Sequence, residues 1–443
     1  MLADRRVLVV GLARSGRAAA ALCRDRGAHV TCVDLRTDLE PVPGCTLRLG
    51  PHRREDFLDS ELIVLSPGVP PSQPDVAAAR ATGIPVIGEF GLAASFLTAP
   101  VIAVTGTNGK STVTHFVGQW LESLGRNVFV GGNLGRPLSE AVDEAYDVIV
   151  AEVSSYQLET VGAFSPVSAA VLNLAPDHLA RHKTMEAYGA VKCSLFELMS
   201  PDAPAVLPAG DALLQRLAAD TGGGRLWLGE LPGAVVEDDG IVFGWGDQEH
   251  RLSLSGFSVP GRHNRWNAAA AALLLLGVDV HPRELDAAAL SALPHRMEPV
   301  ASWNEVLWVN DSKATNVAAA AVGLTSLDRP VVALVGGQTK AGDDFDALGR
   351  ALAEARSVIC FGASGRMLAD LFVGLRPHCV GTMEEAVTRA WALAQPGDAV
   401  LLSPAGASFD AFDNFEHRGD VFRELVRAMG EGSTFARERK QNG

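Results

Sequence analysis

The sequence has no long hydrophobic run and no excess of basic residues. Its longest apolar stretch, residues 268–276, is too short to cross a bilayer, and the apolar run after Arg6 is too short for a secretory signal. Because 38 Lys and Arg oppose 52 Asp and Glu, the net charge is −14, which excludes the basic face that nucleic-acid binding needs. We therefore expect a cytoplasmic protein that binds neither nucleic acid nor membranes.

Cysteine is also scarce, and its spacing is not that of a paired metal-ligand motif. In a chain of this length, scattered cysteines indicate small buried side chains in a reducing compartment. With 443 residues, of which 47% are hydrophobic and 20% charged, the chain can form about three globular domains. The six cysteines are Cys23, Cys32, Cys45, Cys193, Cys360 and Cys379.

Short apolar runs alternate with helix-like segments along the chain, which predicts an α/β fold. We expect three domains, 1–95, 96–293 and 294–443, each built on a mainly parallel sheet. The expected strands lie at 7–10, 29–33, 62–65, 85–87, 100–104, 128–130, 147–153, 169–172, 306–309, 331–335, 357–361 and 399–402.

The most informative motif is the turn at residues 105–112, Thr-Gly-Thr-Asn-Gly-Lys-Ser-Thr, between an expected strand and an expected helix. Such a turn directs backbone N–H groups and the helix dipole at one point, which favours an anion. Lys110 can bind phosphate and the Ser111 hydroxyl can bind magnesium. Because Val104 replaces the first glycine of the full pattern, an ordinary strand–helix turn is the alternative.

A second glycine turn, residues 11–16, follows the first expected strand, and Asp34 ends the next one. This spacing resembles a dinucleotide-binding fingerprint, but Ala13 stands at the middle glycine position. The turn predicts a Rossmann-like domain that binds a nucleotide, and NAD is doubtful. A Rossmann-type oxidoreductase remains an alternative.

Three further side chains could act beside the phosphate loop. Glu152 ends an apolar strand, where a carboxylate can hold magnesium, although a solvated acid is the alternative. His178 follows another strand and could be a ligand or a surface residue. Lys192 lies between Tyr188 and Phe196 on an apolar stripe at helical spacing, where burial would make its amine nucleophilic. The alternative is a lysine that extends its ammonium into water.

Polar loops also follow the expected strands of the last third of the chain, at residues 310–316, 336–340 and 402–419. Because the carboxyl ends of parallel strands meet at one edge of a sheet, these loops should converge. Lys313 and Lys340 suggest recognition of a carboxylate or a phosphate. Each loop taken singly could be an ordinary turn.

These motifs, with residues 263–267 and 295–298, resemble the Mur ligase family over nearly the whole chain. The resemblance implies a Rossmann-like N-terminal domain, a P-loop-type central ATPase and a Rossmann-like C-terminal domain. The N-terminal turn and the loop at 403–419 favour the member that adds D-glutamate, and the Asp-Asn-Pro-Arg motif of the diaminopimelate- or lysine-adding relative is absent. A relative that adds L-alanine is the nearest alternative, and a nucleotide-driven binding module is the weakest.

The resemblance implies an ATP-dependent, ADP-forming ligase of peptidoglycan precursor synthesis, and thus of cell-wall formation, division and shape. ATP would phosphorylate the carboxylate of UDP-N-acetylmuramoyl-L-alanine to an acyl phosphate. The amine of D-glutamate would attack it and release phosphate. We expect a monomer that acts on these small molecules.

The resemblance also implies roles for individual residues. Lys110 contacts the β/γ-phosphates, Ser111 and Glu152 hold one magnesium ion, and His178 and carbamylated Lys192 hold a second. The sugar nucleotide would be bound by Ser15, Asp34, Arg36 and Asn133, and D-glutamate by Thr315, Lys340, Ser408 and Phe415. ATP would be bound by Gly106, Thr107, Asn108, Gly109, Lys110, Ser111, Thr112, Asn264, Asn267, Arg296, Asp311 and Lys313. The chain departs from the family pattern at Ala180 and Gln338, where relatives usually carry Asp.

Overall fold

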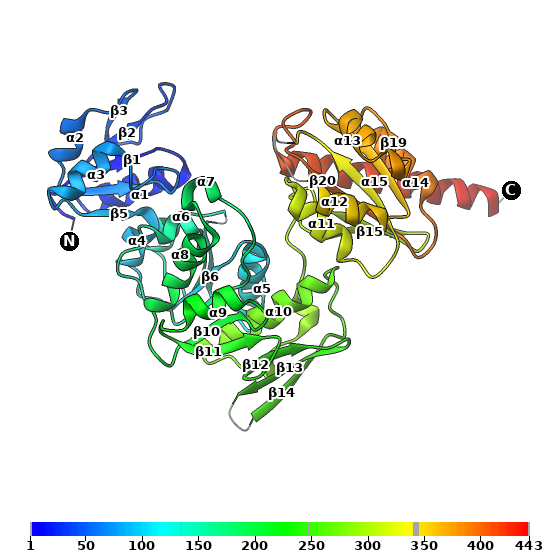
Figure 1. The fold of residues 1–443 in the computed structure, drawn as a ribbon, viewed down its shortest axis with the longest axis horizontal. Helices are drawn as coiled ribbons and strands as arrows, with labels where there is room; N and C mark the ends of the chain where they lie inside the picture. The colour runs from blue at the N-terminus through cyan, green and yellow to red at the C-terminus, as the bar shows by residue number, and fades with distance from the viewer. Residues whose placement is uncertain (1, 134, 246–247, 340–344, 442–443) are drawn as a thin grey trace. The chain divides into compact units, whose positions relative to one another are not determined.

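Strands and helices alternate through a computed structural model that describes residues 2–133, 135–245, 248–339 and 345–441. Three mainly parallel sheets confirm the predicted α/β class (Figure 1). By compactness the chain divides into two units. The first contains Met1–Ser255 and Asn267–Ala289, and the second contains Gly256–Trp266 and Leu290–Gly443.

The first sheet is parallel throughout, in the order β3-β2-β1-β4-β5. Helix α1 (Arg14–Asp25) packs on one face, while α2 (Arg54–Leu58) and α3 (Pro74–Ala81) cover the other. Glycine is required at Gly16 because a Cβ there would lie 1.8 Å from the Gly11 carbonyl oxygen, so α1 can approach β1 closely. The strands are β1 (Arg6–Val10), β2 (His29–Asp34), β3 (Thr46–Leu49), β4 (Leu62–Leu65) and β5 (Val86–Gly88).

The second sheet also belongs to the first unit and has the order β14-β13-β12-β11-β10-β9-β6-β8-β7. It is parallel from β7 to β12, and an antiparallel extension joins β12, β13 and β14. Its strands are β6 (Val101–Thr105), β7 (Val128–Gly132), β8 (Val148–Glu152), β9 (Ser168–Val171), β10 (Pro204–Pro208), β11 (Gly224–Leu228), β12 (Gly233–Val236), β13 (Gly240–Trp245) and β14 (Gln248–Ser253).

Apolar residues place the helices against this sheet. Strand β6 is buried at every position, and the predicted apolar run lies in α10, where Ala268 to Leu275 are fully buried. None of the helices in the described ranges is long and apolar enough to cross a membrane. The helices of this region are α4 (Glu89–Ala94), α5 (Lys110–Ser123), η1 (Leu138–Ala141), α6 (Ser155–Leu158), α7 (Leu179–His182), α8 (Met185–Glu197), α9 (Ala212–Ala218), α10 (Arg262–Leu275), η2 (Leu276–Val278), η3 (Pro282–Glu284) and η4 (Ala287–Ala289).

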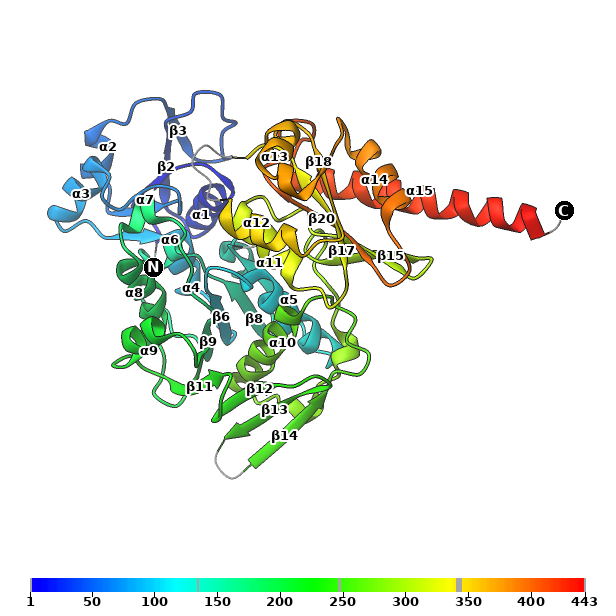
Figure 2. The same cartoon turned by 45° about the vertical axis from the view of Figure 1, so that its right-hand side comes forward.

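The third sheet lies in the second unit, in the order β15-β16-β20-β17-β18-β19. Among the strands that the structure describes in this sheet, β15 alone is antiparallel to its neighbour. Helices α11 and α12 pack on one face and α14 and α15 on the other (Figure 2). The strands are β15 (Glu298–Trp303), β16 (Val306–Asn310), β17 (Val331–Gly336), β18 (Ser357–Phe361), β19 (His378–Cys379) and β20 (Ala399–Ala405). The helices are α11 (Val317–Thr325), α12 (Asp346–Ala353), α13 (Gly365–Leu371), η5 (Val373–Leu375), α14 (Met383–Leu393) and α15 (Phe415–Gln441).

Candidate active site

The turn at residues 105–112 connects β6 to α5, as the sequence predicts. Gly109 precedes the helix with φ +84°, a left-handed conformation that favours glycine. Asn173 holds the turn from the end of β9, because its Oδ1 accepts from the Asn108 N–H at 2.8 Å and its Nδ2 donates to the Asn108 carbonyl at 3.0 Å. The turn therefore has the strand–glycine–helix geometry of a phosphate-binding loop.

Two lysines meet at this loop. Lys110 and Lys192 both donate to the Gly106 carbonyl oxygen at 2.9 Å, and Lys110 also donates to the Thr107 carbonyl at 2.8 Å. The interpretation of Lys192 as a lysine that reaches into water is wrong, because it is only 1% exposed on α8. Burial, followed by the charge of Lys110, lowers the pKa of Lys192 to about 7.

Glu152 lies at the carboxyl end of β8, paired in register with Val104 just before the loop. The alternative of a solvated acid is wrong, because Glu152 is only 3% exposed. Its Oε1 accepts from Asn133 Nδ2 at 2.6 Å, whereas its buried Oε2 has no hydrogen-bond partner among the described residues. A buried carboxylate oxygen without a partner is unfavourable, so a cation bound there would fit the donor set.

His178 precedes the short helix α7. Its ring is half exposed, so the structure also agrees with the alternative prediction that His178 is a surface residue. Its Nδ1 lies 3.2 Å from the Tyr156 hydroxyl and its Nε2 lies 3.4 Å from the Asp177 carboxylate. The His178 ring is 6.4 Å from the Tyr188 ring, and Lys192 Nζ is 4.6 Å from that same ring. His178 and Lys192 therefore flank one tyrosine.

Lys110, Glu152 and Lys192 thus lie around the loop that follows β6. Ser111 lies in the first turn of α5, and His178 is linked to Lys192 through the Tyr188 ring. The described residues contain no cluster of three or more His, Cys, Asp or Glu side chains suited to a metal. The predicted ligands are instead the Ser111 hydroxyl, the Glu152 carboxylate, His178 and a carbamylated Lys192. No role was predicted for Tyr156, Asn173, Asp177 or Tyr188. Asn173 and Asp177 lie in the same loop as His178, and this proximity in sequence was the available signal.

The N-terminal turn forms a second polar site in the first unit. Asp34 accepts from the Leu12 N–H at 2.7 Å and pairs with Arg36 at 2.9 Å, and the Arg36 guanidinium holds the pKa of this buried carboxyl well below its usual range. Ser15 lies in the first turn of α1. Asn133, predicted on the sugar-nucleotide side, donates from Nδ2 to Glu152 Oε1 at 2.6 Å.

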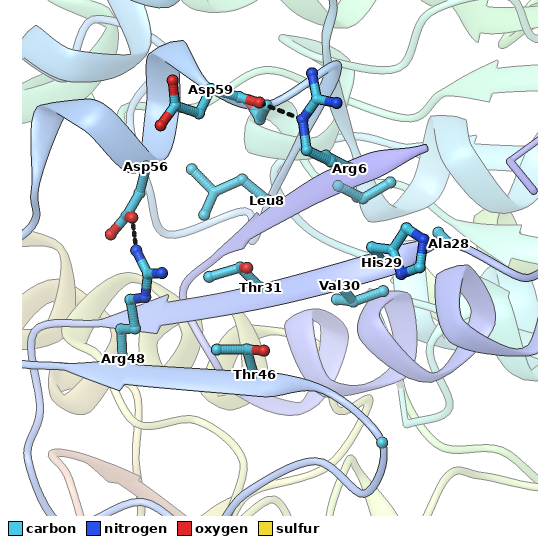
Figure 3. A pocket seen from close by; sticks show the side chains of 13 residues that line it. Arg6, Leu8, Ala28, His29, Val30, Thr31, Thr46, Arg48, Asp56 and Asp59 are labelled. Carbon is cyan, nitrogen blue, oxygen red and sulfur yellow. Dashed lines mark hydrogen bonds and ion pairs between the residues drawn. The ribbon is translucent and has the colours of Figure 1, made fainter. Parts of the chain in front are cut away.

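A cavity of about 370 Å³ lies elsewhere on the first sheet, over β1 to β3. Thr31 and Thr46 stand on adjacent strands at its floor, and the Arg48–Asp56 ion pair lies at its rim (Figure 3). Its lining includes none of the predicted site residues.

The second unit carries other residues that the resemblance assigns to ATP. Asp311 is buried and accepts from the Ser403 hydroxyl at 3.0 Å and from the Met297 N–H at 3.2 Å. Burial raises the pKa of Asp311 to about 7, against the opposing charge of Arg296. The Nε of Arg296 is buried without a hydrogen-bond partner in the described ranges.

Asn264 and Asn267 fall in different units although both lie on α10. In the second unit, Asn264 Nδ2 donates to the Pro260 carbonyl at 2.6 Å. In the first unit, Asn267 lies against the phosphate loop, because a Cβ on Gly109 would be 2.8 Å from its Oδ1.

The predicted convergence of the C-terminal loops is confirmed, since β20 lies between β16 and β17. Ser312 Oγ donates to the Phe415 carbonyl at 2.8 Å, and Lys313 Nζ lies 5.6 Å from the Phe415 ring. Ser408 is buried, and Thr315 donates its N–H to the Lys313 carbonyl at 2.8 Å. Lys340 lies outside the described residues.

Arg418 connects these loops and was missed by sequence reasoning. It is fully buried, and its guanidinium donates to Ser312 Oγ at 2.9 Å, to the Ser312 carbonyl at 2.8 Å and to the Gly406 carbonyl at 3.0 Å. The sequence signal was weak, because an arginine in a polar loop is usually exposed.

A phosphate-binding loop lies beside a buried carboxylate and a buried lysine, and two further α/β sheets accompany the sheet that carries it. This architecture defines a class of enzyme that activates its substrate with a nucleoside triphosphate. Family models match three parts of the chain. They describe a MurD-like N-terminal domain at residues 5–88, a Mur ligase middle domain at 104–275 and a glutamate ligase domain at 295–406. The chain belongs to the Mur ligase family, as the sequence resemblance predicts.

Full-length relatives agree with this assignment. The chain is 41% identical over 450 residues to a UDP-N-acetylmuramoylalanine–D-glutamate ligase from Desulfosudis oleivorans, with 97% of each chain covered. It is 42% identical to the ligase of the same name from Anaeromyxobacter dehalogenans, covering 96% of this chain and 98% of the relative. The fold is similar to that of the MurF ligase of Thermotoga maritima in complex with ADP, with a TM-score of 0.60, 17% identity and coverage of 97% and 99%.

Proposed function

We propose that this protein joins D-glutamate to UDP-N-acetylmuramoyl-L-alanine in peptidoglycan precursor synthesis, with conversion of ATP to ADP and phosphate. The observation that carries the proposal is the near full-length similarity to relatives named for this reaction, at about two identical residues in five. The phosphate loop with its two lysines supports the same chemistry from the geometry.

The reaction needs activation because a carboxylate is a poor electrophile. Attack of the substrate carboxylate on the γ-phosphorus of ATP breaks the bond to ADP and gives an acyl phosphate. The amine of D-glutamate then attacks the acyl carbon, loses a proton and displaces phosphate. Lys110 and the N–H groups of residues 106–112 would stabilise the phosphate charge that develops in the first step.

We propose that two magnesium ions bind at the ends of β6 and β8. Ser111 and Glu152 would hold the first ion, and the buried Glu152 Oε2 without a partner supports this assignment. His178 and Lys192 would hold the second, once the neutral Lys192 amine has added to CO2 and released a proton to form a carbamate. When bound, the ions neutralise the phosphate charge and orient the oxygens that react.

The remaining residues would bind the substrates. ATP would also contact Asn264, Asn267, Arg296, Asp311 and Lys313. We assign Ser15, Asp34, Arg36 and Asn133 to the sugar nucleotide, and Thr315, Lys340, Ser408 and Phe415 to D-glutamate. We retain 1–95, 96–293 and 294–443 as the proposed domains. We also propose a monomer, and a cytoplasmic location because its nucleotide substrates are cytoplasmic.

Two alternatives from the sequence are less well supported. The alternative of an oxidoreductase depended on the turn at residues 11–16. This turn lies in the region matched by a Mur ligase N-terminal model. The L-alanine-adding ligase shares the fold, as the UDP-N-acetylmuramate–alanine ligase of Thermotoga maritima does at a TM-score of 0.57, but its identity is only 18%.

Phosphate release from purified enzyme distinguishes the two ligases. The enzyme is incubated with ATP, magnesium and either UDP-N-acetylmuramoyl-L-alanine plus D-glutamate or UDP-N-acetylmuramate plus L-alanine. We expect release only in the first mixture, and loss of that release in Lys110→Ala. Release only with L-alanine would refute the proposal.

A further inference from the structure

Both ring nitrogens of His178 have a neighbour in the structure. On one side the Tyr156 hydroxyl lies 3.2 Å from Nδ1, and on the other the Asp177 carboxylate lies 3.4 Å from Nε2. The Tyr156 and His178 rings are also stacked at a tilt, with centroids 4.9 Å apart. The ring is therefore held by a hydroxyl at one nitrogen and by an aromatic face.

The tyrosine itself is fixed by contacts that hold its helix. Ser154 caps α6 through a reciprocal pair of hydrogen bonds with Gln157, and Ser155 Oγ lies 3.0 Å from the buried His182 Nε2. The Arg181 guanidinium lies 4.9 Å from the centre of the Tyr156 ring and is paired with Glu159. The hydroxyl is thus presented to His178 from a rigid support.

The chemistry of imidazole gives this hydroxyl a task. A neutral histidine carries one N–H, so Nε2 can bind a cation only when the proton is on Nδ1. An Nδ1–H needs an acceptor, and the phenol oxygen of Tyr156 is placed to accept it. The Asp177 carboxylate lies 3.4 Å from the other ring nitrogen, Nε2.

We propose that Tyr156 is a positioning residue: its hydroxyl oxygen accepts the Nδ1–H of His178 and so directs Nε2 towards a divalent cation. This inference rests on the proposed function, which gives His178 a metal. The competing explanation is that Tyr156 only packs against the ring, in which case a phenylalanine would serve equally well.

Tyr156→Phe separates these explanations because it removes the hydroxyl and keeps the aromatic ring. Tyr146→Phe is a matched control: its hydroxyl contacts Glu144 and its ring packs on Phe129, away from the phosphate loop. Mn²⁺ binding by EPR, with a non-hydrolysable ATP analogue, gives the affinity. We expect about 3- to 10-fold weaker binding in Tyr156→Phe, from the loss of one oriented hydrogen bond, and no change in Tyr146→Phe.

A second readout follows the ring directly. In ¹⁵N-histidine-labelled enzyme with Mg²⁺ and the analogue, the His178 signals are assigned by their loss in His178→Gln. We expect an Nδ1–H that exchanges slowly with water in the wild type and quickly in Tyr156→Phe.

The outcomes separate the inference from the function. If His178→Gln weakens Mn²⁺ binding while Tyr156→Phe changes neither affinity nor exchange, the inference is refuted and the proposed metal role stands. If His178→Gln leaves Mn²⁺ affinity unchanged, the metal role of His178 and the inference both fail. Signals that place the proton on Nε2 in the metal-bound wild type would also overturn the inference.

Discussion

Lys192 provides the sharpest prediction, because its burial changes how much neutral amine it offers to CO2. Its side chain is 1% exposed and its pKa is lowered from 10.5 to about 7. At pH 8 roughly 90% of such an amine is neutral, against about 0.3% of an ordinary lysine, a difference of about 300-fold. Because only the neutral amine adds to CO2, carbamylation at a fixed bicarbonate concentration should rise with pH through 7 and level off by about pH 8.5, where nearly all of the uncarbamylated amine is neutral.

Carbon-13 NMR of enzyme equilibrated with ¹³C-bicarbonate measures this directly. We expect one carbamate signal with a midpoint near pH 7 that disappears in Lys192→Ala. The exposed Lys183 is the matched control, since Lys183→Gln should leave the signal unchanged. Magnesium should strengthen the signal, because the anionic carbamate would be a metal ligand.

Lys192→Ala should lower turnover by about 100-fold or more, because it removes a metal ligand from a site that otherwise carries few anionic groups. Bicarbonate or acetate at millimolar concentration should restore part of the activity by occupying the space of the lost side chain. Full activity in Lys192→Ala, or a carbamate signal that survives the substitution, would refute the role we give to this residue.

Three further predictions concern other buried groups. Asp311→Asn should raise the KM for ATP and also stabilise the protein, with a gain in unfolding free energy about 2 kcal/mol larger at pH 8 than at pH 5. The pKa of Asp311 is raised to about 7 in the fold, so the wild type loses stability as pH rises towards 7. Arg418→Met should lower the unfolding free energy by roughly 3 kcal/mol, because it leaves buried carbonyls unpaired. It should also raise the KM for D-glutamate more than that for ATP, because Arg418 connects the loops assigned to D-glutamate. Glu152→Gln should raise the magnesium concentration for half-maximal activity at least about 10-fold.

Each of these has its own control. Thermal or urea unfolding measures this difference for Asp311→Asn. An equal gain in unfolding free energy at pH 5 and pH 8 would contradict the raised pKa that burial gives Asp311. The exposed Arg366 on α13 gives the comparison for Arg418, and Arg366→Met should change neither stability nor KM. Unchanged magnesium dependence in Glu152→Gln would remove Glu152 from the metal site.

Local patterns predicted much of the fold. The apolar runs that form β1, β6, β16 and β20 are short, continuous and bounded by turn residues, so the strands could be located before any contact was known. The position of the phosphate loop followed for the same reason, since a glycine turn between a strand and a helix is a local feature. The edge strand β3 was missed, because its alternation of exposed and half-buried residues is weak.

The site was only partly predictable, because its decisive contacts join residues far apart in sequence. Lys192 was a candidate on its helix, but its burial against the Gly106 carbonyl depends on α8 packing on β9, the strand beside β6. The hydrogen bond from Asn133 to Glu152 could not be predicted either, since it forms because β7 and β8 are neighbours in the sheet. Arg418 had only a weak signal in the sequence, since its partners lie in loops that only the sheet order brings together.

Sequence alone determined the α/β class, the positions of many strands along the chain, the phosphate loop and the family, because each depends on periodicity or on motifs within a few residues. Tertiary structure decided which polar groups are buried and which atoms they meet. Glu152 and Lys192 illustrate the reason: the pKa and the bonding of a side chain depend on desolvation and on neighbouring charges, and both are set by packing between distant segments.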